Sequence, residues 1–209
     1  MAEESRPPTS HERSSGQNWD ASYRDGSAPW DIGRAQSAVA RVVREGAFRG
    51  AVLDAGCGTG DNTLLIASLG VPVLGFDVAA TAIDMARDAA TRQGSAAEFV
   101  VADAFRLENL GRTFDTVLDS GLFHTFDAAE QRSYATSLAT VTAPGATVYL
   151  LCFADVGSDL GPHPISRNDL NAAFDASNGW NVRTIEPDLI ETRYHDNGAP
   201  GWFATIDRI

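Results

Sequence analysis

The chain has 209 residues and a formal net charge of −12, with 44% hydrophobic and 21% charged residues. This length suits one domain with a sizeable core and is short for two. An acidic chain without runs of Lys or Arg is a poor match for nucleic acid, whose phosphates require a basic face. No stretch approaches the roughly 20 apolar residues of a membrane span, and the N-terminus has no apolar signal-peptide core. We therefore expect a cytoplasmic protein that binds neither nucleic acid nor membrane.

The chain divides by composition into a tail, an aromatic segment and one domain. Residues 1–16 are polar and rich in Ser and Pro, which predicts a disordered, mobile tail. Residues 17–34, "QNWDASYRDGSAPWDIGR", are the expected lid segment, and residues 35–209 are the expected domain. Cys57 and Cys152 have neither metal-site spacing nor a disulfide framework, so we expect two buried thiols and no metal site.

Strands and helices alternate along the expected domain. The expected helices cover 35–48, 60–69, 79–92, 128–141 and a segment capped by Ser166. The expected strands cover 51–56, 71–77, 96–103, 114–121, 146–153, 180–195 (bent near Pro187) and 201–209. The first five strands are mostly continuous apolar runs, which is typical of a parallel sheet covered on both faces. The last two are joined by the short turn "DNGAPG" and must pair antiparallel. The prediction is an α/β fold with a Rossmann-like, seven-stranded, mostly parallel sheet, an antiparallel C-terminal hairpin and helices on both faces.

A glycine-rich turn, "VLDAGCGTGDNT" from Val52 to Thr63, follows the first strand. Its G-x-G-x-G spacing differs from the G-x-G-x-x-G of dinucleotide-binding turns. A pyrophosphate here would lie near Asp54 and Asp61. At such short distances, like charges repel each other by ~1–4 kcal/mol in a partly wet site. A ligand that carries both an ammonium and a carboxylate suits the turn better. The glycine N–H groups can take the carboxylate, and Asp54 can hold the amine directly or through water.

Two further strand ends describe the rest of this ligand. Asp77 ends the second strand, 17 residues after Gly60, and can accept hydrogen bonds from ribose hydroxyls. After the third strand, Asp103 can accept from the exocyclic amine of adenine, and the Ala104 N–H can donate to a ring nitrogen. Amino acid, ribose and adenine together make S-adenosylmethionine. The alternative is that these aspartates only form turns, but three at successive strand ends favour the ligand.

These motifs resemble those of the class I S-adenosylmethionine-dependent methyltransferases. "VLDAGCGTG" is similar to their first motif, "GFDVA" to their second-strand acid and "VADAF" to their adenine-side motif. The resemblance implies the fold of residues 35–209 and the methyl donor, with S-adenosylhomocysteine as product, and says little about the acceptor. The cofactor residues expected in the domain are Asp54, Gly56, Cys57, Gly58, Gly60, Asn62, Asp77, Val78, Asp103, Ala104, Phe105 and Asp119.

The aromatic segment resembles the N-terminal motif of the thiopurine and plant thiol/halide methyltransferases, approximately W-x-x-x-Y/W…P-W-D-x-G. In that group the segment closes over the cofactor, and aromatic faces attract a cationic donor. The alternative is a structural strap that only covers a sheet face. Arg34 is either a cofactor contact or an ion pair at a helix start. The donor-site residues that this resemblance implies are Trp19, Tyr23, Trp30, Asp31 and Gly33.

The acceptor is expected at the loop after the fourth strand, "LDSGLFHTFD". His124 is a candidate general base because the usual histidine pKa lies near neutrality, and the alternative is a histidine with structural hydrogen bonds only. Tyr23 is a second candidate for the catalytic group. We expect no part for His11 or His195. The expected substrate residues are Phe123, His124 and His163.

The tetrapeptide "GLFH" is similar to small actinobacterial methyltransferases that act on hydroxylated or nitrogen heteroaromatics, including quinolone-type molecules. The main hypothesis is therefore methyl transfer to oxygen or nitrogen of such a small molecule, by a monomer or homodimer. The first alternative is methyl transfer to a thiol, a thiopurine or a halide. Two remoter alternatives are a nicotinamide oxidoreductase, which the acids and the glycine spacing disfavour, and a non-catalytic cofactor-binding protein.

Overall fold

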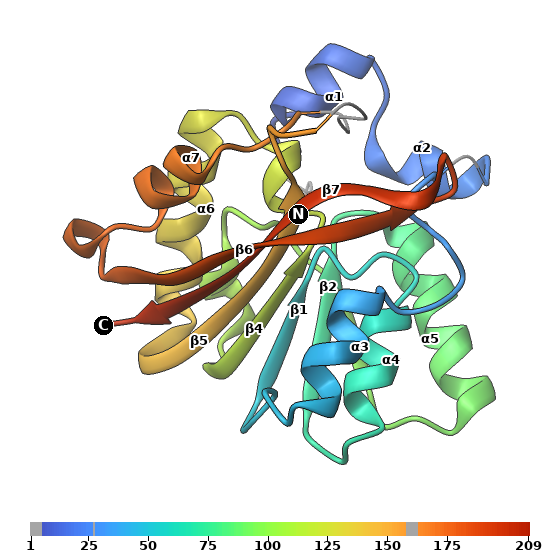
Figure 1. Ribbon diagram of the computed structural model, residues 1–209. Coiled ribbons are helices and arrows are strands. Elements are labelled where there is room, and N and C mark those ends of the chain that lie inside the picture. Colours follow the sequence, from blue (N-terminus) through green and yellow to red (C-terminus); the bar gives the residue numbers. More distant parts are fainter. Residues whose placement is uncertain (1–5, 27, 158–162) are drawn as a thin grey trace.

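A computed structural model describes residues 6–26, 28–157 and 163–209 (Figure 1). Within these residues, one sheet has the strand order β3-β2-β1-β4-β5-β7-β6. The strands are β1 (Val52–Ala55), β2 (Val73–Asp77), β3 (Glu98–Val101), β4 (Phe114–Ser120), β5 (Thr142–Phe153), β6 (Trp180–Thr192) and β7 (His195–Arg208). β1 to β5 pair in parallel, whereas β7 pairs antiparallel with both β5 and β6. The predicted α/β fold, with a mostly parallel sheet and an antiparallel C-terminal hairpin, is confirmed.

Helices cover both faces of the sheet, as Figure 1 shows. One face carries α3 (Ser37–Arg44), α4 (Asp61–Ala67) and α5 (Ala80–Gln93), and the other carries α6 (Ala128–Thr140) and α7 (Arg167–Ala173). Short 3-10 turns are η1 (Leu107–Leu110), η2 (Phe123–Thr125) and η3 (Ala176–Asn178), and α1 (Ser10–Ser15) and α2 (Trp19–Arg24) precede the sheet. Fully buried Tyr134 of α6 and Trp180 of β6 belong to one apolar cluster, and Val39 of α3 and Ile66 of α4 belong to another. Each face of the sheet thus has its own apolar core, as a parallel sheet requires.

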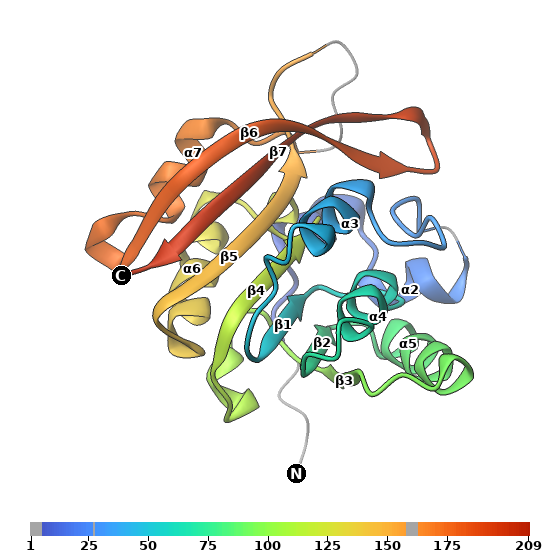
Figure 2. The same cartoon turned by 60° about the horizontal axis from the view of Figure 1, so that its bottom comes forward.

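The C-terminal hairpin differs from the prediction. Its turn lies between Thr192 and His195, and the predicted turn "DNGAPG" is inside β7. The ladder shifts register between Ile190 and Thr192, while Pro187, where the sequence predicts a bend, pairs regularly with Trp202. Pro187 is tolerated there because β6 is an edge strand, where a missing N–H need not break the ladder. The longer hairpin extends past the parallel strands toward the segment before α3 (Figure 2).

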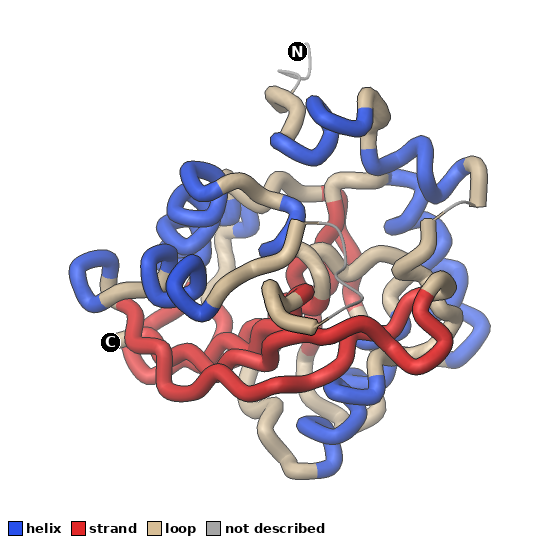
Figure 3. The backbone as a smooth tube through the Cα atoms, turned by 45° about the horizontal axis from the view of Figure 1, so that its top comes forward, coloured by secondary structure: helices blue, strands red, loops and turns tan. Residues whose placement is uncertain are grey.

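The N-terminal segment also differs from the prediction of a mobile tail. Residues 10–15 form α1, and Thr9 begins the helix with a reciprocal capping box to Glu12. The sequence signal was present, because "TSHE" has the S/T-x-x-E spacing of such a cap. Residues 1–5 of the predicted tail lie outside the described residues. Figure 3 shows the N-terminal helices on one side of the sheet's end and the hairpin on the other.

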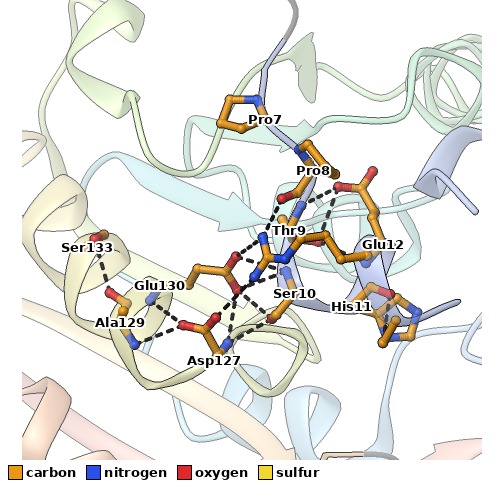
Figure 4. A network of polar contacts seen from close by, with 12 residues as sticks. Pro7, Pro8, Thr9, Ser10, His11, Glu12, Asp127, Ala129, Glu130 and Ser133 are labelled. Atoms are coloured by element: carbon orange, nitrogen blue, oxygen red, sulfur yellow. Dashed lines mark hydrogen bonds and ion pairs between the residues drawn. The ribbon is translucent and has the colours of Figure 1, made fainter. Parts of the chain in front are cut away.

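Long-range contacts hold α1 against the start of α6 (Figure 4). The Ser10 N–H and hydroxyl donate to the Glu130 carboxylate at 2.8 Å and 2.5 Å. Arg13 forms ion pairs with Glu130 and Asp127, both at 3.2 Å. These partners are more than 100 residues away along the chain, so composition alone could not reveal that the segment is anchored.

A buried carboxyl shapes the turn after β4. Asp119 is fully buried, and its Oδ1 accepts from the backbone N–H groups of Leu122 at 2.9 Å and Phe123 at 3.2 Å. Its Oδ2 has no hydrogen-bond partner among the residues that the structure describes. Burial raises the pKa of Asp119 to about 7. Asp119 therefore fixes the turn that begins η2, at the cost of a carboxyl whose ionised form is poorly solvated.

We predict that Asp119→Asn weakens the pH dependence of folding stability. The carboxyl ionises near pH 3.8 in the unfolded chain and at about pH 7 in the folded one. Between these values the folded state binds the extra proton, so the free energy of unfolding falls as pH rises. Since Asn does not ionise, the fall between pH 5 and pH 8, measured by urea denaturation, should shrink by about 1–3 kcal/mol.

The control is Asp84→Asn on α5, where the carboxylate is exposed. It should keep the pH dependence of the wild type. Equal pH dependence in all three proteins would contradict the assignment of this titration to Asp119.

Candidate active site

A cavity of about 350 Å³ lies at the carboxyl ends of the parallel strands. Its walls come from the turns after β1 to β5, from α1, from the strap, which comprises α2 and residues 28–36, and from the tip of the β6–β7 hairpin. Cavities of roughly 300–1,000 Å³ at this position of an α/β sheet are typical of small-molecule sites.

Most of the sequence-predicted site residues meet at this cavity, but five do not. Those that line it are Trp19, Tyr23, Trp30, Asp31, Gly56, Cys57, Gly58, Asn62, Asp77, Val78, Asp103, Ala104, Phe105, His124 and His163. Those that lie outside its lining are Gly33, Asp54, Gly60, Asp119 and Phe123. Of these, Asp54, Asp119 and Phe123 are buried.

Asp77 holds the glycine turn at the end of the cavity formed by β1, β2 and β3, called here the donor end. One carboxylate oxygen accepts from the Gly58 N–H at 3.0 Å, and the other from the Ala79 N–H at 2.9 Å. Gly58 has a φ of 54°, and a Cβ there would lie 2.9 Å from the Tyr23 hydroxyl. Only glycine allows this conformation and this close approach without strain.

Carboxylates surround the glycine turn. Asp31 and Asp61 both line the cavity, and burial together with the charge of Asp31 raises the pKa of Asp61. Asp54 lies beneath the turn, where its Oδ2 accepts from the Thr63 hydroxyl at 2.5 Å and burial raises its pKa to about 7. Of the two ways in which Asp54 was expected to hold an amine, directly or through water, its place beneath the turn favours the second. The donor end as a whole favours a ligand group that carries positive charge.

The aromatic strap lies against the glycine turn. Trp30 donates its indole N–H to the Tyr23 hydroxyl at 2.9 Å, and the Trp30 ring meets the Trp19 ring edge-on with centroids 5.4 Å apart. Burial, followed by the charge of Asp77, raises the pKa of Tyr23 well above its usual value. A tyrosine so placed is a poor proton acceptor. The sequence left two roles for Arg34, a cofactor contact or an ion pair at a helix start. In the structure it forms an ion pair with Glu191 at 2.8 Å.

His124, in the turn after β4, lines the part of the cavity next to Phe153, called here the acceptor end. Its ring lies 4.6 Å from the Phe153 ring between centroids, and its Nδ1 is buried without a hydrogen-bond partner among the described residues. Burial, then the charges of His163 and His11, lowers the pKa of His124 to about 3. The imidazole is therefore neutral at physiological pH and is a weak base. A buried ring nitrogen without a partner is suited to a hydrogen bond with a bound ligand.

Two histidines that the sequence analysis set aside also line the cavity. His11 stacks on Trp19 with centroids 4.4 Å apart, and its Nδ1 lies 3.3 Å from Nε2 of His163. His195 Nδ1 lies 2.6 Å from the Thr192 hydroxyl. Although the sequence analysis expected no part for them, both lie at the cavity because tertiary contacts bring α1 and the hairpin tip there. All four histidines of the chain thus face one cavity.

The described residues hold no cluster of three His, Cys, Asp or Glu side chains that could bind a metal ion. In residues 6–26, 28–157 and 163–209, no helix is long and apolar enough to span a membrane.

Comparisons with known proteins agree with this geometry. The methyltransferase-domain family matches residues 52–145. The 2-heptyl-1-hydroxyquinolin-4(1H)-one methyltransferase of Mycobacteroides abscessus is 35% identical over 81% of this chain and 74% of its own. A probable thiol methyltransferase of Arabidopsis thaliana is 30% identical over 74% of this chain and 70% of its own.

Solved structures show the same fold. One solved structure comes from work on the conversion of a disulfide bond into a thioacetal group during echinomycin biosynthesis. It is 36% identical to this chain, with a TM-score of 0.82, and the match covers 91% of this chain and 90% of the other. The magnesium protoporphyrin IX methyltransferase of Synechocystis, with bound S-adenosylmethionine, is 22% identical, covers 83% of this chain and 77% of its own, and has a TM-score of 0.63. The chain therefore belongs to the S-adenosylmethionine-dependent methyltransferases.

Proposed function

We propose that the acceptor is a small, planar, hydroxylated heteroaromatic molecule of the hydroxyquinolone type, methylated on oxygen or nitrogen. The observation that carries this proposal is the division of charge within the cavity. The described acids that line it, Asp31, Asp61, Asp77 and Asp103, belong to the strap or to the turns after β1, β2 and β3. The acceptor end instead presents aromatic rings and imidazoles. Such a wall accepts a flat ring with an electron-rich oxygen, which a carboxylate would repel.

We propose that the donor end holds S-adenosylmethionine as its motifs suggest. Three features support this fit. Both oxygens of the Asp77 carboxylate are held in place by backbone N–H groups. The glycine turn lets a ligand approach the backbone closely, and Asp103 and Ala104 line the cavity after the third strand. The donor supplies an electrophilic methyl group on a sulfonium. The strap aromatics Trp19 and Trp30 can stabilise that positive charge and exclude water.

We propose that His124 orients the acceptor rather than removing its proton. Its low pKa makes proton transfer unfavourable, while its buried Nδ1 lacks a partner. Rate enhancement would then come from holding the acceptor atom in line with the methyl group, which can lower a barrier by roughly 7–11 kcal/mol. An acceptor that ionises on its own near neutral pH needs no base.

The second candidate function is methyl transfer to a thiol. It is supported by the thiol methyltransferase relative and by the same acid-free acceptor end, which would also admit a thiolate. The remaining proposals are that the protein acts as a monomer or homodimer in the cytoplasm, with no nucleic acid as partner. The net charge of −12 supports the last of these.

We predict that Asp77→Ala weakens donor binding at least tenfold. The substitution removes an ionised hydrogen-bond acceptor worth roughly 1.5–3 kcal/mol per bond. Asp77→Asn keeps one acceptor oxygen and should lose less. Calorimetric titration with S-adenosylhomocysteine measures both, and circular dichroism checks the fold. If a folded Asp77→Ala protein bound S-adenosylhomocysteine with unchanged affinity, Asp77 would not belong to the donor site.

We predict that a hydroxyquinolone is a better methyl acceptor than a thiol or a halide. The protein and S-adenosylmethionine are incubated with 2-heptyl-1-hydroxyquinolin-4(1H)-one, thiophenol or iodide, and methylated products are measured by mass spectrometry. The hydroxyquinolone should have a kcat/KM at least tenfold above that of thiophenol. The reverse order would establish the thiol function, and no product from any acceptor would favour a non-catalytic role.

We predict a small effect of His124 substitution. Loss of one neutral hydrogen bond, in His124→Leu, should lower kcat/KM for the best acceptor by about 2–10-fold. His124→Gln, which can still hydrogen bond, should recover most of it. A general base would contribute about 10²–10⁴-fold, so a loss of that size in both variants would restore His124 as the base.

A further inference from the structure

The β6–β7 hairpin and the strap are joined by a group of contacts centred on Glu191. Its carboxylate accepts two hydrogen bonds from the Arg34 guanidinium, at 2.8 Å and 3.1 Å, and one from the Ser37 N–H at 2.8 Å. Its backbone N–H donates to the Gln36 side chain at 2.8 Å, and its carbonyl accepts from the same amide at 2.9 Å. We call Arg34, Gln36, Ser37 and Glu191 the Glu191 clasp.

The clasp combines three exposed bonds, to the Glu191 carboxylate, with two partly buried bonds between Gln36 and the Glu191 backbone. Two-point pairing between arginine and a carboxylate is among the stronger and more directional hydrogen-bond arrangements. Gln36 is 7% exposed, so its amide depends on the Glu191 backbone for partners. Glu191 lies at the register shift of the hairpin, between Ile190 and Thr192. The ladder irregularity thus coincides with the point where the hairpin bonds to the strap.

A second link follows two residues later. The Arg193 N–H donates to the Pro29 carbonyl at 2.8 Å, and its guanidinium lies 3.6 Å from the Asp31 carboxylate. The ion pair is partly exposed and contributes little. The hydrogen bond of the Arg193 N–H forms only when the hairpin and the strap are in contact. Exchange of this N–H with solvent therefore measures that contact.

The two linked segments line different parts of the cavity. The strap supplies Trp30 and Asp31 beside the glycine turn, and the Gln36 backbone N–H donates to Asn62 of α4 at 3.0 Å. The hairpin supplies His195 to the acceptor end, where its ring lies 6.2 Å from the Phe153 ring between centroids. The hairpin residues that line the cavity are Ile190, Thr192, Tyr194 and His195.

We propose that the Glu191 clasp couples the two ends of the cavity, so that a ligand at the donor end fixes the hairpin wall of the acceptor end. A ligand shifts an equilibrium only through contacts that differ between two states. A donor-end ligand contacts the strap, and the strap bonds the hairpin only when both are in place. Glu191 is thus a positioning residue, and donor and acceptor bind with positive, reciprocal coupling. The identity of the acceptor end rests on the proposed function.

The test is hydrogen exchange at the Arg193 amide, measured by NMR with and without saturating S-adenosylhomocysteine. In the wild type, the ligand should slow exchange at least fivefold, the lower end of typical couplings. In Glu191→Ala the slowing should fall below twofold, although the ligand still saturates the protein. Glu186→Ala, an exposed carboxylate on the same strand, should behave as the wild type.

Two results would overturn the coupling: no slowing in the wild type, or equal slowing in Glu191→Ala and the wild type. If Glu191→Ala does not fold, Arg34→Gln removes the same ion pair from its exposed side and should also lose the slowing. Retained slowing in that variant would equally overturn it.

A binding measurement separates this inference from the proposed function. The Kd of S-adenosylhomocysteine should fall at least fivefold when 2-heptyl-1-hydroxyquinolin-4(1H)-one is present, and the factor should approach one in Glu191→Ala. If the hydroxyquinolone does not bind, the proposed acceptor is wrong, while the exchange experiment still decides the coupling. If it binds but leaves the Kd of the wild type unchanged, the coupling is wrong.

Discussion

The hydrogen bond from the Gly58 N–H to the Asp77 carboxylate is the contact on which the site depends. It joins the end of β2 to the glycine turn after β1 and so fixes the floor of the donor end. Because the same carboxylate also accepts from the Ala79 N–H, it sets where α5 begins as well. The Tyr23 hydroxyl then lies so close to the turn that Gly58 has no room for a side chain, which sets the position of the strap.

Charge divides the cavity that is built on this floor. Acids concentrate at the donor end, where a sulfonium and an ammonium would neutralise them, and the described part of the acceptor end has none. In a chain with a net charge of −12, the acceptor end is the part of the cavity that would least repel an anionic oxygen or sulfur. Burial keeps His124 neutral there, so this side chain can form a hydrogen bond without carrying a positive charge.

The sequence predicted what depends on local pattern and missed what depends on tertiary contact. Apolar runs and short turns were enough for the mostly parallel sheet and its hairpin. The glycine turn and the strand-end acids Asp77 and Asp103, predicted from local motifs, do line one cavity. The burial of individual side chains could not be predicted from the sequence. Asp54 and Asp119 have the sequence positions of ligand carboxylates, but both are buried under turns. His11 and His195 reach the cavity only because α1 docks on α6 and the hairpin extends to the strap, through partners far along the chain.

The central claim is that one cavity holds the donor at the acidic end, with its reactive centre directed to the histidine-lined end. A crystal structure with S-adenosylhomocysteine tests it most directly. We predict ribose hydroxyls within hydrogen-bond distance of Asp77, adenine beside Asp103, and the sulfur facing the side where His124 and Phe153 lie. A ligand bound with its sulfur directed away from these two residues, or bound outside this cavity, would contradict the account.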